Sequence, residues 1–89
     1  MLDQLSHIEA AALAALAQTP DTTALEAWRV AHLGRSAPLM AVLGDLGRLD
    51  KAERPAIGQR GNEVKRALEA AYAARAEALR AAEMEAALR

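Results

Sequence analysis

Apolar residues recur at intervals of three and four along most of the chain, the spacing that places them on one face of an α-helix. Residues 2–17 carry the first such stripe, made of Leu5, Ile8, Ala12, Leu13 and Leu16. We expect Asp3 to cap this helix at its N-terminus. Pro20 ends it at or just before Thr19, because the proline ring clashes with a preceding helical turn.

A second helix is predicted from about Thr22 to Leu33. Its first turn follows Thr19, Asp21 and Thr22, any of which can act as N-cap, and Gly34 ends it. Leu25 and Trp28 face inward in this prediction. A third, short helix restarts at an N-cap Ser36, and Gly44 and Gly47 mark its end and the following turn.

The last helix begins between Asp50 and Pro55, where Asp50 and Glu53 have the spacing of a capping box. Its apolar face is formed by Ile57, Gly61, Val64, Leu68, Tyr72 and Leu79. No glycine or proline stops this helix before Arg89, so it is predicted to exceed thirty residues. The missing stop also suggests that the chain is a fragment of a longer protein whose catalytic domain is absent.

These elements predict an all-α fold, an antiparallel helical hairpin or coiled coil with an additional short N-terminal helix. Residues 1–89 form one unit, in which 22–46 fold back on 53–80 with the turn near residues 48–50. Facing residues then have numbers that add up to about 100. This register places Trp28 beside Tyr72 and Leu33 near Leu68, with Leu39 and Leu43 opposite Gly61 and Gly58.

Composition removes several classes of function. The chain has no cysteine, which excludes disulfides and thiolate metal sites, and its apolar runs are too short for a membrane span. His7 and His32 are far apart in sequence, and no nucleophile, nucleotide-binding or metal motif is present. We therefore expect a cytoplasmic chain with no catalytic residue, metal site or cofactor of its own.

The net charge of −1 conceals a basic segment in the middle of the chain. Residues 1–28 carry four acidic and no basic side chains, whereas residues 29–66 carry eight basic and four acidic ones. Lysine and arginine at a helical tip can reach phosphates without reading sequence. The candidate nucleic-acid-binding residues are Arg35, Arg48, Lys51, Arg54, Arg60 and Lys65. Charge alone also fits a solvated loop, and Trp28 and Tyr72 fit core positions better than base-stacking ones.

A more specific pattern extends over residues 29–65. It consists of Arg29-Val30-Ala31-His32-Leu33-Gly34-Arg35, then Leu39, Leu43, Leu46 and Leu49, then Glu53-Arg54-Pro55 with Gly58, Asn62 and Lys65. In order and spacing it resembles the N-terminal domain of the bacterial phenylalanyl-tRNA synthetase alpha subunit. This chain departs from the family where Ser36, Ala37 and Pro38 follow Arg35, which leaves Arg35 without a second basic neighbour.

The resemblance implies a coiled-coil arm that precedes a class II catalytic domain and holds tRNA(Phe) by its phosphate backbone. The whole enzyme would be a phenylalanine–tRNA ligase that uses ATP and Mg²⁺ and forms an (αβ)₂ assembly with a beta subunit. The alternative is a coiled-coil hairpin that binds protein and not RNA. An arm of the seryl-tRNA synthetase type would require a longer uninterrupted hairpin, which the break at Gly34 argues against.

Overall fold

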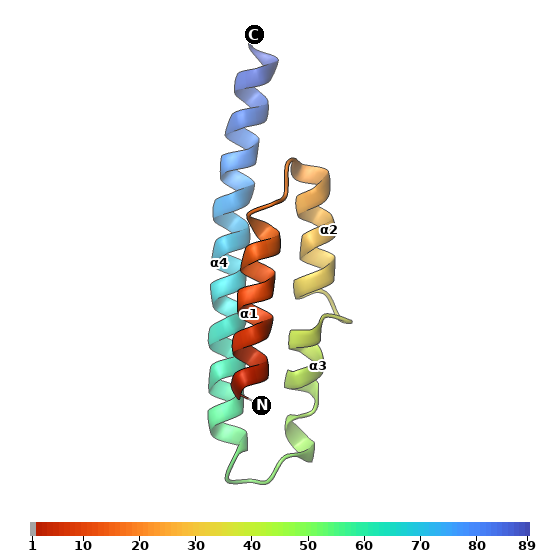
Figure 1. Cartoon of the computed structure of the whole chain (residues 1–89), viewed down its shortest axis with the longest axis vertical. Coiled ribbons are helices and arrows are strands. Elements are labelled where there is room, and N and C mark those ends of the chain that lie inside the picture. Colours follow the sequence, from red (N-terminus) through yellow and green to blue (C-terminus); the bar gives the residue numbers. More distant parts are fainter. Residues whose placement is uncertain (1) are drawn as a thin grey trace.

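The computed structural model describes residues 2–89, and Met1, the first residue of the expected unit, lies outside the described residues. The helices are α1 (Leu2–Leu16), α2 (Thr22–Leu33), α3 (Pro38–Gly44) and α4 (Arg54–Ala87), with a 3₁₀ turn, η1 (Leu46–Arg48), before the loop to α4. In Figure 1, α2 and α3 follow one another down one side of the molecule, and α4 returns antiparallel to them. The predicted all-α helical hairpin is confirmed.

The N-terminal helix is a third member of the bundle. α1 runs parallel to α4 and packs mainly against it, and it also contacts α2 and α3 (Figure 1). Three of its side chains, Leu5, Ala12 and Leu16, are buried in the common core. Leu13, which the sequence stripe also placed inside, is 39% exposed. The helix therefore buries a narrower face than the stripe predicted.

Caps and breakers explain most helix boundaries. The Asp21 carboxylate accepts a 2.8 Å hydrogen bond from the Ala24 backbone N–H, so Asp21 is the N-cap of α2. The predictions for Asp3 and Ser36 were wrong: α1 already includes Asp3, and α3 is preceded by Ala37 without a side-chain cap. Pro38 favours the start of α3 by holding φ near its helical value, and this short helix begins without a capping hydroxyl.

The C-terminal end of α2 depends on a glycine for space. Gly34 has an extended backbone (φ −76°, ψ 173°), so no left-handed conformation is involved. A Cβ atom at this position would collide with the Val30 carbonyl oxygen. Since Gly34 also donates its backbone N–H to that carbonyl, at 3.2 Å, the close approach is part of the helix end. Any larger residue would have to open this turn.

Trp28 joins three helices at the centre of the bundle. The residue is 4% exposed, and its indole N–H donates a 2.8 Å hydrogen bond to the Ala12 carbonyl of α1. Its ring stacks on Tyr72 of α4, with 6.2 Å between centroids and 11° between planes. The predicted pairing of Trp28 with Tyr72 is confirmed, and so is the core position of the tryptophan.

The register of the hairpin changes between this pair and the tip. Leu43 lies on Gly61, and Leu46 lies near Gly58, whereas the uniform register placed Leu39 and Leu43 opposite these glycines. The break between α2 and α3, residues 34–37, bulges away from α4 in Figure 1. Because these residues bulge outward, they add little length along the axis of α4. Partners beyond the break are therefore shifted by about one helical turn.

The two α4 glycines provide a matched stability test. A Cβ at Gly58 would lie 3.6 Å from the nearest Leu46 methyl, an ordinary contact, so Gly58→Ala should raise the free energy of unfolding by about 0.8–1 kcal/mol through helix propensity. A Cβ at Gly61 would lie 2.5 Å from a Leu43 methyl, so Gly61→Ala should lose that gain or reverse it. Urea unfolding of both variants checks the order. Equal stabilisation by the two would contradict the close contact at Gly61.

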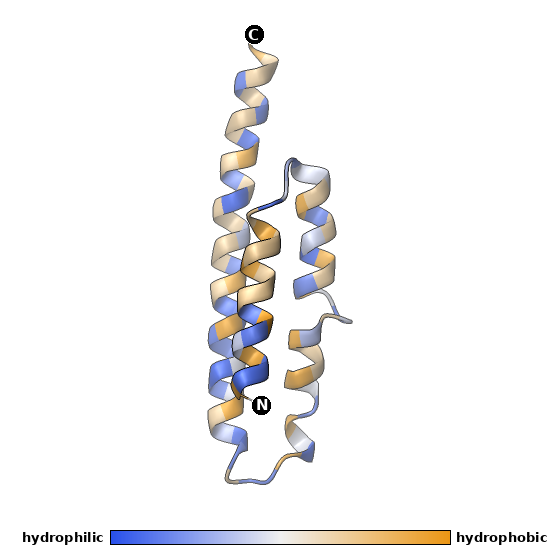
Figure 2. Ribbon diagram, in the orientation of Figure 1, coloured by the Kyte–Doolittle hydropathy of each residue, from blue (hydrophilic) through white to orange (hydrophobic). Residues whose placement is uncertain are grey.

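The bundle is elongated, with extents of 58 × 18 × 15 Å. The C-terminal part of α4 extends beyond the other helices, and its surface alternates hydrophilic and weakly apolar positions (Figures 1 and 2). Within residues 2–89, no helix combines the length and apolar character needed to cross a bilayer.

Candidate nucleic-acid interface

The end of the hairpin is the loop from η1 to the start of α4, and it presents two basic side chains to solvent. Arg48 is the last residue of η1, and its side chain is 86% exposed. Its guanidinium lies 3.8 Å from the Asp45 carboxylate, an ion pair at the surface that contributes little. Lys51 is exposed in the next turn. Both side chains are free to reach an anion at the tip.

Arg54 lies at the same tip but is directed into the protein. Its Nε donates to the Leu49 carbonyl and its Nη2 to the Gly47 carbonyl, both at 2.9 Å. These carbonyls belong to the end of η1, where helical partners are missing. The side chain is partly buried by the loop that it binds. Two of its N–H groups are therefore already used in holding the backbone of the tip.

Arg60 is also engaged within the protein. Its guanidinium forms a 2.9 Å ion pair with Glu9 of α1 and a 3.7 Å ion pair with Glu63 one turn further along α4. The side chains of Arg60 and Glu9 are 30% and 24% exposed, so this pair is better shielded from solvent than Arg48 and Asp45. This role of Glu9 could not be predicted from the sequence alone, because its partner is 51 residues away along the chain. Arg60 fastens α1 to α4.

The remaining two candidates lie away from the loop. Arg35 is exposed in the break between α2 and α3, halfway along the hairpin, and Lys65 is half-buried on α4. The six predicted residues therefore do not form one cluster. Arg48 and Lys51 form the exposed tip cations, which is the name used for this pair below.

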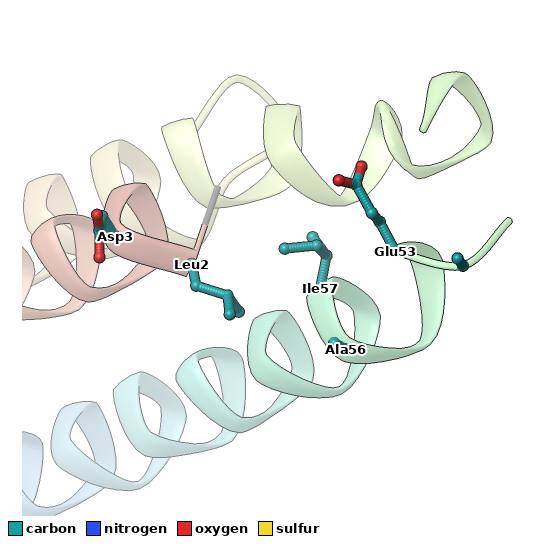
Figure 3. A pocket seen from close by; sticks show the side chains of 6 residues that line it. Leu2, Asp3, Glu53, Ala56 and Ile57 are labelled. Carbon is teal, nitrogen blue, oxygen red and sulfur yellow. The ribbon is translucent and has the colours of Figure 1, made fainter. Parts of the chain in front are cut away.

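One side of the tip is acidic. A hollow between the start of α1 and the start of α4 is lined by Leu2, Asp3, Ala52, Glu53, Ala56 and Ile57. Figure 3 shows Leu2 and Ile57 converging in this hollow, with the carboxylates of Asp3 and Glu53 at its margins. Two carboxylates disfavour a phosphate there, because like charges repel. An RNA backbone would have to approach the tip cations from another side.

A second hollow is lined by Gln4, His7, Ile8, Ala11, His32 and Pro38, and brings the two histidines to one groove. His32 packs against Trp28, with 5.2 Å between ring centroids. Within residues 2–89, no group of three or more histidine, cysteine or acidic side chains is placed to share a metal ion. This groove does not provide a set of metal ligands.

Burial lowers the pKa of His32 below its ordinary value of 6.5, because the charged imidazolium loses solvation. The unfolded chain thus binds a proton at a pH at which the folded chain does not. His32 therefore costs no stability above about pH 6.5 but lowers the free energy of unfolding as the pH falls below that value. We expect His32→Gln to show a smaller loss between pH 7 and pH 5 in urea unfolding. Identical pH profiles for the two chains would contradict this contribution.

Comparison with known proteins identifies the family of the chain. Residues 20–88 match the family described as the N-terminal domain of class II aminoacyl-tRNA synthetases. The chain belongs to this family. The expected resemblance to the N-terminal domain of the phenylalanyl-tRNA synthetase alpha subunit is confirmed, since the similar curated proteins carry the name phenylalanine–tRNA ligase alpha subunit.

Three relatives illustrate the extent of the match. The protein from Symbiobacterium thermophilum is 46% identical over 89 residues, which is 99% of this chain and 26% of that protein. The one from Thioalkalivibrio sulfidiphilus is 45% identical over 87 residues, 98% of this chain and 26% of the relative. The one from Shewanella woodyi is 39% identical over 87 residues, 98% of this chain and 27% of the relative. This synthetase N-terminal domain thus spans about a quarter of the length of these curated relatives.

The family match and the helical bundle cover different residue ranges. The match begins at residue 20, so α1 lies outside it, although the full-length relatives align with α1 as well. In the bundle, α1 supplies Glu9 to Arg60 and the Ala12 carbonyl to Trp28. The domain of this synthetase family is therefore completed here by a helix that contributes both core packing and acidic charge.

Proposed function

We propose that this chain is the tRNA-binding arm of a phenylalanine–tRNA ligase alpha subunit. The observation that carries the proposal is the position of the exposed tip cations at one end of an elongated bundle that belongs to a synthetase family. Arg48 and Lys51 would neutralise backbone phosphates of tRNA(Phe) and release counterions. Phosphate contacts position an RNA and carry no sequence information, so the tRNA would be identified elsewhere.

The proposal extends to the whole protein. In a cytoplasmic enzyme, a class II catalytic domain outside this chain would join phenylalanine to tRNA(Phe) with ATP and Mg²⁺, in an (αβ)₂ assembly with a beta subunit. Among the described residues, no three or more histidine, cysteine or acidic side chains are placed to share a metal ion, so the Mg²⁺ of the proposed reaction would be held outside this chain. In this proposal the arm takes no part in the chemistry. It acts as a rigid spacer that holds the body of the tRNA.

The alternative function is a coiled-coil hairpin that binds protein and not RNA. Met84, in the protruding part of α4, and Leu88, its C-cap, favour it, because they are apolar and 63% and 82% exposed. Salt separates the two functions: phosphate binding weakens steeply as salt rises, whereas apolar helix pairing does not.

Fluorescence anisotropy of a labelled tRNA(Phe) transcript tests the proposal. The chain should bind at about 50 mM salt and lose most of its affinity at about 200 mM. Sedimentation of the chain without RNA over a range of concentrations is the companion measurement. A chain that self-associates at both salt concentrations and leaves the anisotropy unchanged would support the protein-binding hairpin instead.

A further inference from the structure

We infer that Arg54 is a positioning residue of the tip: it acts by fixing the loop that presents Arg48 and Lys51, and does not itself bind phosphate. This inference rests on the proposed RNA-binding function. Its basis is the pair of 2.9 Å hydrogen bonds from the Arg54 guanidinium to the carbonyls of Gly47 and Leu49. Hydrogen bonds from a charged donor are stronger than neutral ones, which suits a role in holding backbone.

The two acceptors flank one of the tip cations. Arg48 stands between Gly47 and Leu49, so a guanidinium bound to both neighbouring carbonyls restricts the backbone on each side of Arg48. The Arg48 backbone N–H is also fixed, by a 2.9 Å bond to the Asp45 carbonyl. The Gly47–Arg48 peptide is therefore held at both groups, by Arg54 at its carbonyl and by the Asp45 carbonyl at its N–H, which restricts the direction in which the Arg48 side chain leaves the backbone.

The second tip cation lies in the loop that Arg54 closes. Lys51 is situated between the acceptor Leu49 and the donor Arg54. Within this loop, the Asp50 carbonyl accepts the backbone N–H groups of Glu53, at 2.9 Å, and Arg54, at 3.2 Å. These backbone bonds shape the turn, but they do not tie it to η1. Among the described residues, the Arg54 side chain supplies that tie by hydrogen bonding.

Arg54 is itself well anchored. It is the first residue of α4 and is followed by Pro55, which restricts the backbone of the first turn. One turn later, Ile57 is only 6% exposed in the core. The start of α4 is therefore a firm base from which a planar guanidinium with a fixed fork of donors can hold two carbonyls.

A lysine at this position separates the two roles. Lysine keeps the positive charge and can still contact a phosphate, but its single ammonium lacks the fork that binds both carbonyls. Arg54→Lys should therefore lose tRNA affinity almost as much as Arg54→Gln, on the order of tenfold at moderate salt. Wild-type affinity in Arg54→Lys would show a direct phosphate contact and overturn the inference.

A double-mutant cycle provides the second readout, with a tRNA(Phe) transcript as the probe. If Arg54 acts through the tip cations, Arg54→Gln should change the affinity of the Arg48→Gln, Lys51→Gln chain by less than about twofold. A residue that contacts RNA on its own, or one that only supports the overall fold, should add its full loss to this background. Additive losses would overturn the inference. Arg80→Gln, which neutralises an exposed cation on the C-terminal part of α4, is the matched control.

Hydrogen exchange of the RNA-free chain makes the two failures distinguishable. Arg54→Gln and Arg54→Lys should accelerate exchange of the amides of residues 48–54 and leave the core amides of α1 and α4 unchanged. Unchanged exchange in the loop would overturn the positioning role even if tRNA binds. If the Arg54 variants exchange faster in the loop but the wild-type chain does not bind tRNA, the proposed function is rejected. The role of Arg54 in holding the loop would then still stand.

Discussion

Replacing Trp28 with alanine is expected to lower the free energy of unfolding by about 3–5 kcal/mol, the range for truncating a large buried aromatic residue. The change removes the packing between α1, α2 and α4, the stack on Tyr72 and the hydrogen bond to Ala12. A domain of this size is stable by only about 5–10 kcal/mol. Much of the stability of the bundle would therefore be lost.

Urea unfolding followed by circular dichroism measures this loss. Val30→Ala is the control on the same helix, because Val30 is 59% exposed, and it should change the stability by less than about 0.5 kcal/mol. Trp28→Phe should fall between the two, since it keeps an aromatic ring and removes the indole donor. Similar stabilities for Trp28→Ala and Val30→Ala would show that α1 is not held on the hairpin through this residue.

The second large effect is expected on RNA affinity. Arg48→Gln and Lys51→Gln together should weaken binding of a tRNA(Phe) transcript about tenfold at moderate salt and reduce the slope of log affinity against log salt by about 1.4–1.8. The reason is the loss of two phosphate contacts and of the counterions that they release. Both side chains are exposed, so helicity and unfolding should not change.

The matched control neutralises two arginines far from the tip. Arg80 lies on the C-terminal part of α4 and Arg89 just beyond its end, with side chains 68% and 79% exposed. Anisotropy titrations of Arg80→Gln, Arg89→Gln should reproduce the wild-type affinity to within about twofold. A loss as large as that of the tip variant would mean that RNA responds to the total charge of the chain and not to the tip.

The sequence was sufficient for the helices but not for their relative register. Pro20 and Asp21 mark the end of α1 and the start of α2 by backbone chemistry that operates locally. The hairpin register depends on how far the break at residues 34–37 bulges, which follows from contacts across the bundle. The pairing of Leu43 with Gly61 could therefore not be predicted from the apolar stripe.

The candidate interface shows the same division. Charge counting located a basic segment and found Arg48 and Lys51, which need only be exposed. It could not separate them from Arg54 and Arg60, because the direction of an arginine side chain depends on acceptors brought close by folding. Arg54 donates hydrogen bonds to carbonyl groups of the tip loop. Arg60 forms an ion pair with Glu9, which lies on a helix distant in sequence. Sequence analysis therefore identified the cations but not the roles of each.

The central claim is that the tip of this hairpin contacts RNA phosphates, and a ¹⁵N-resolved NMR titration with tRNA at low and then moderate salt tests it most directly. The account predicts shifts centred on residues 48–54 that fade as salt is added, and no shifts on the core stripes of α1. Shifts along the leucine and alanine stripes on raising the protein concentration, with none on adding tRNA, would contradict it and identify a protein-binding hairpin.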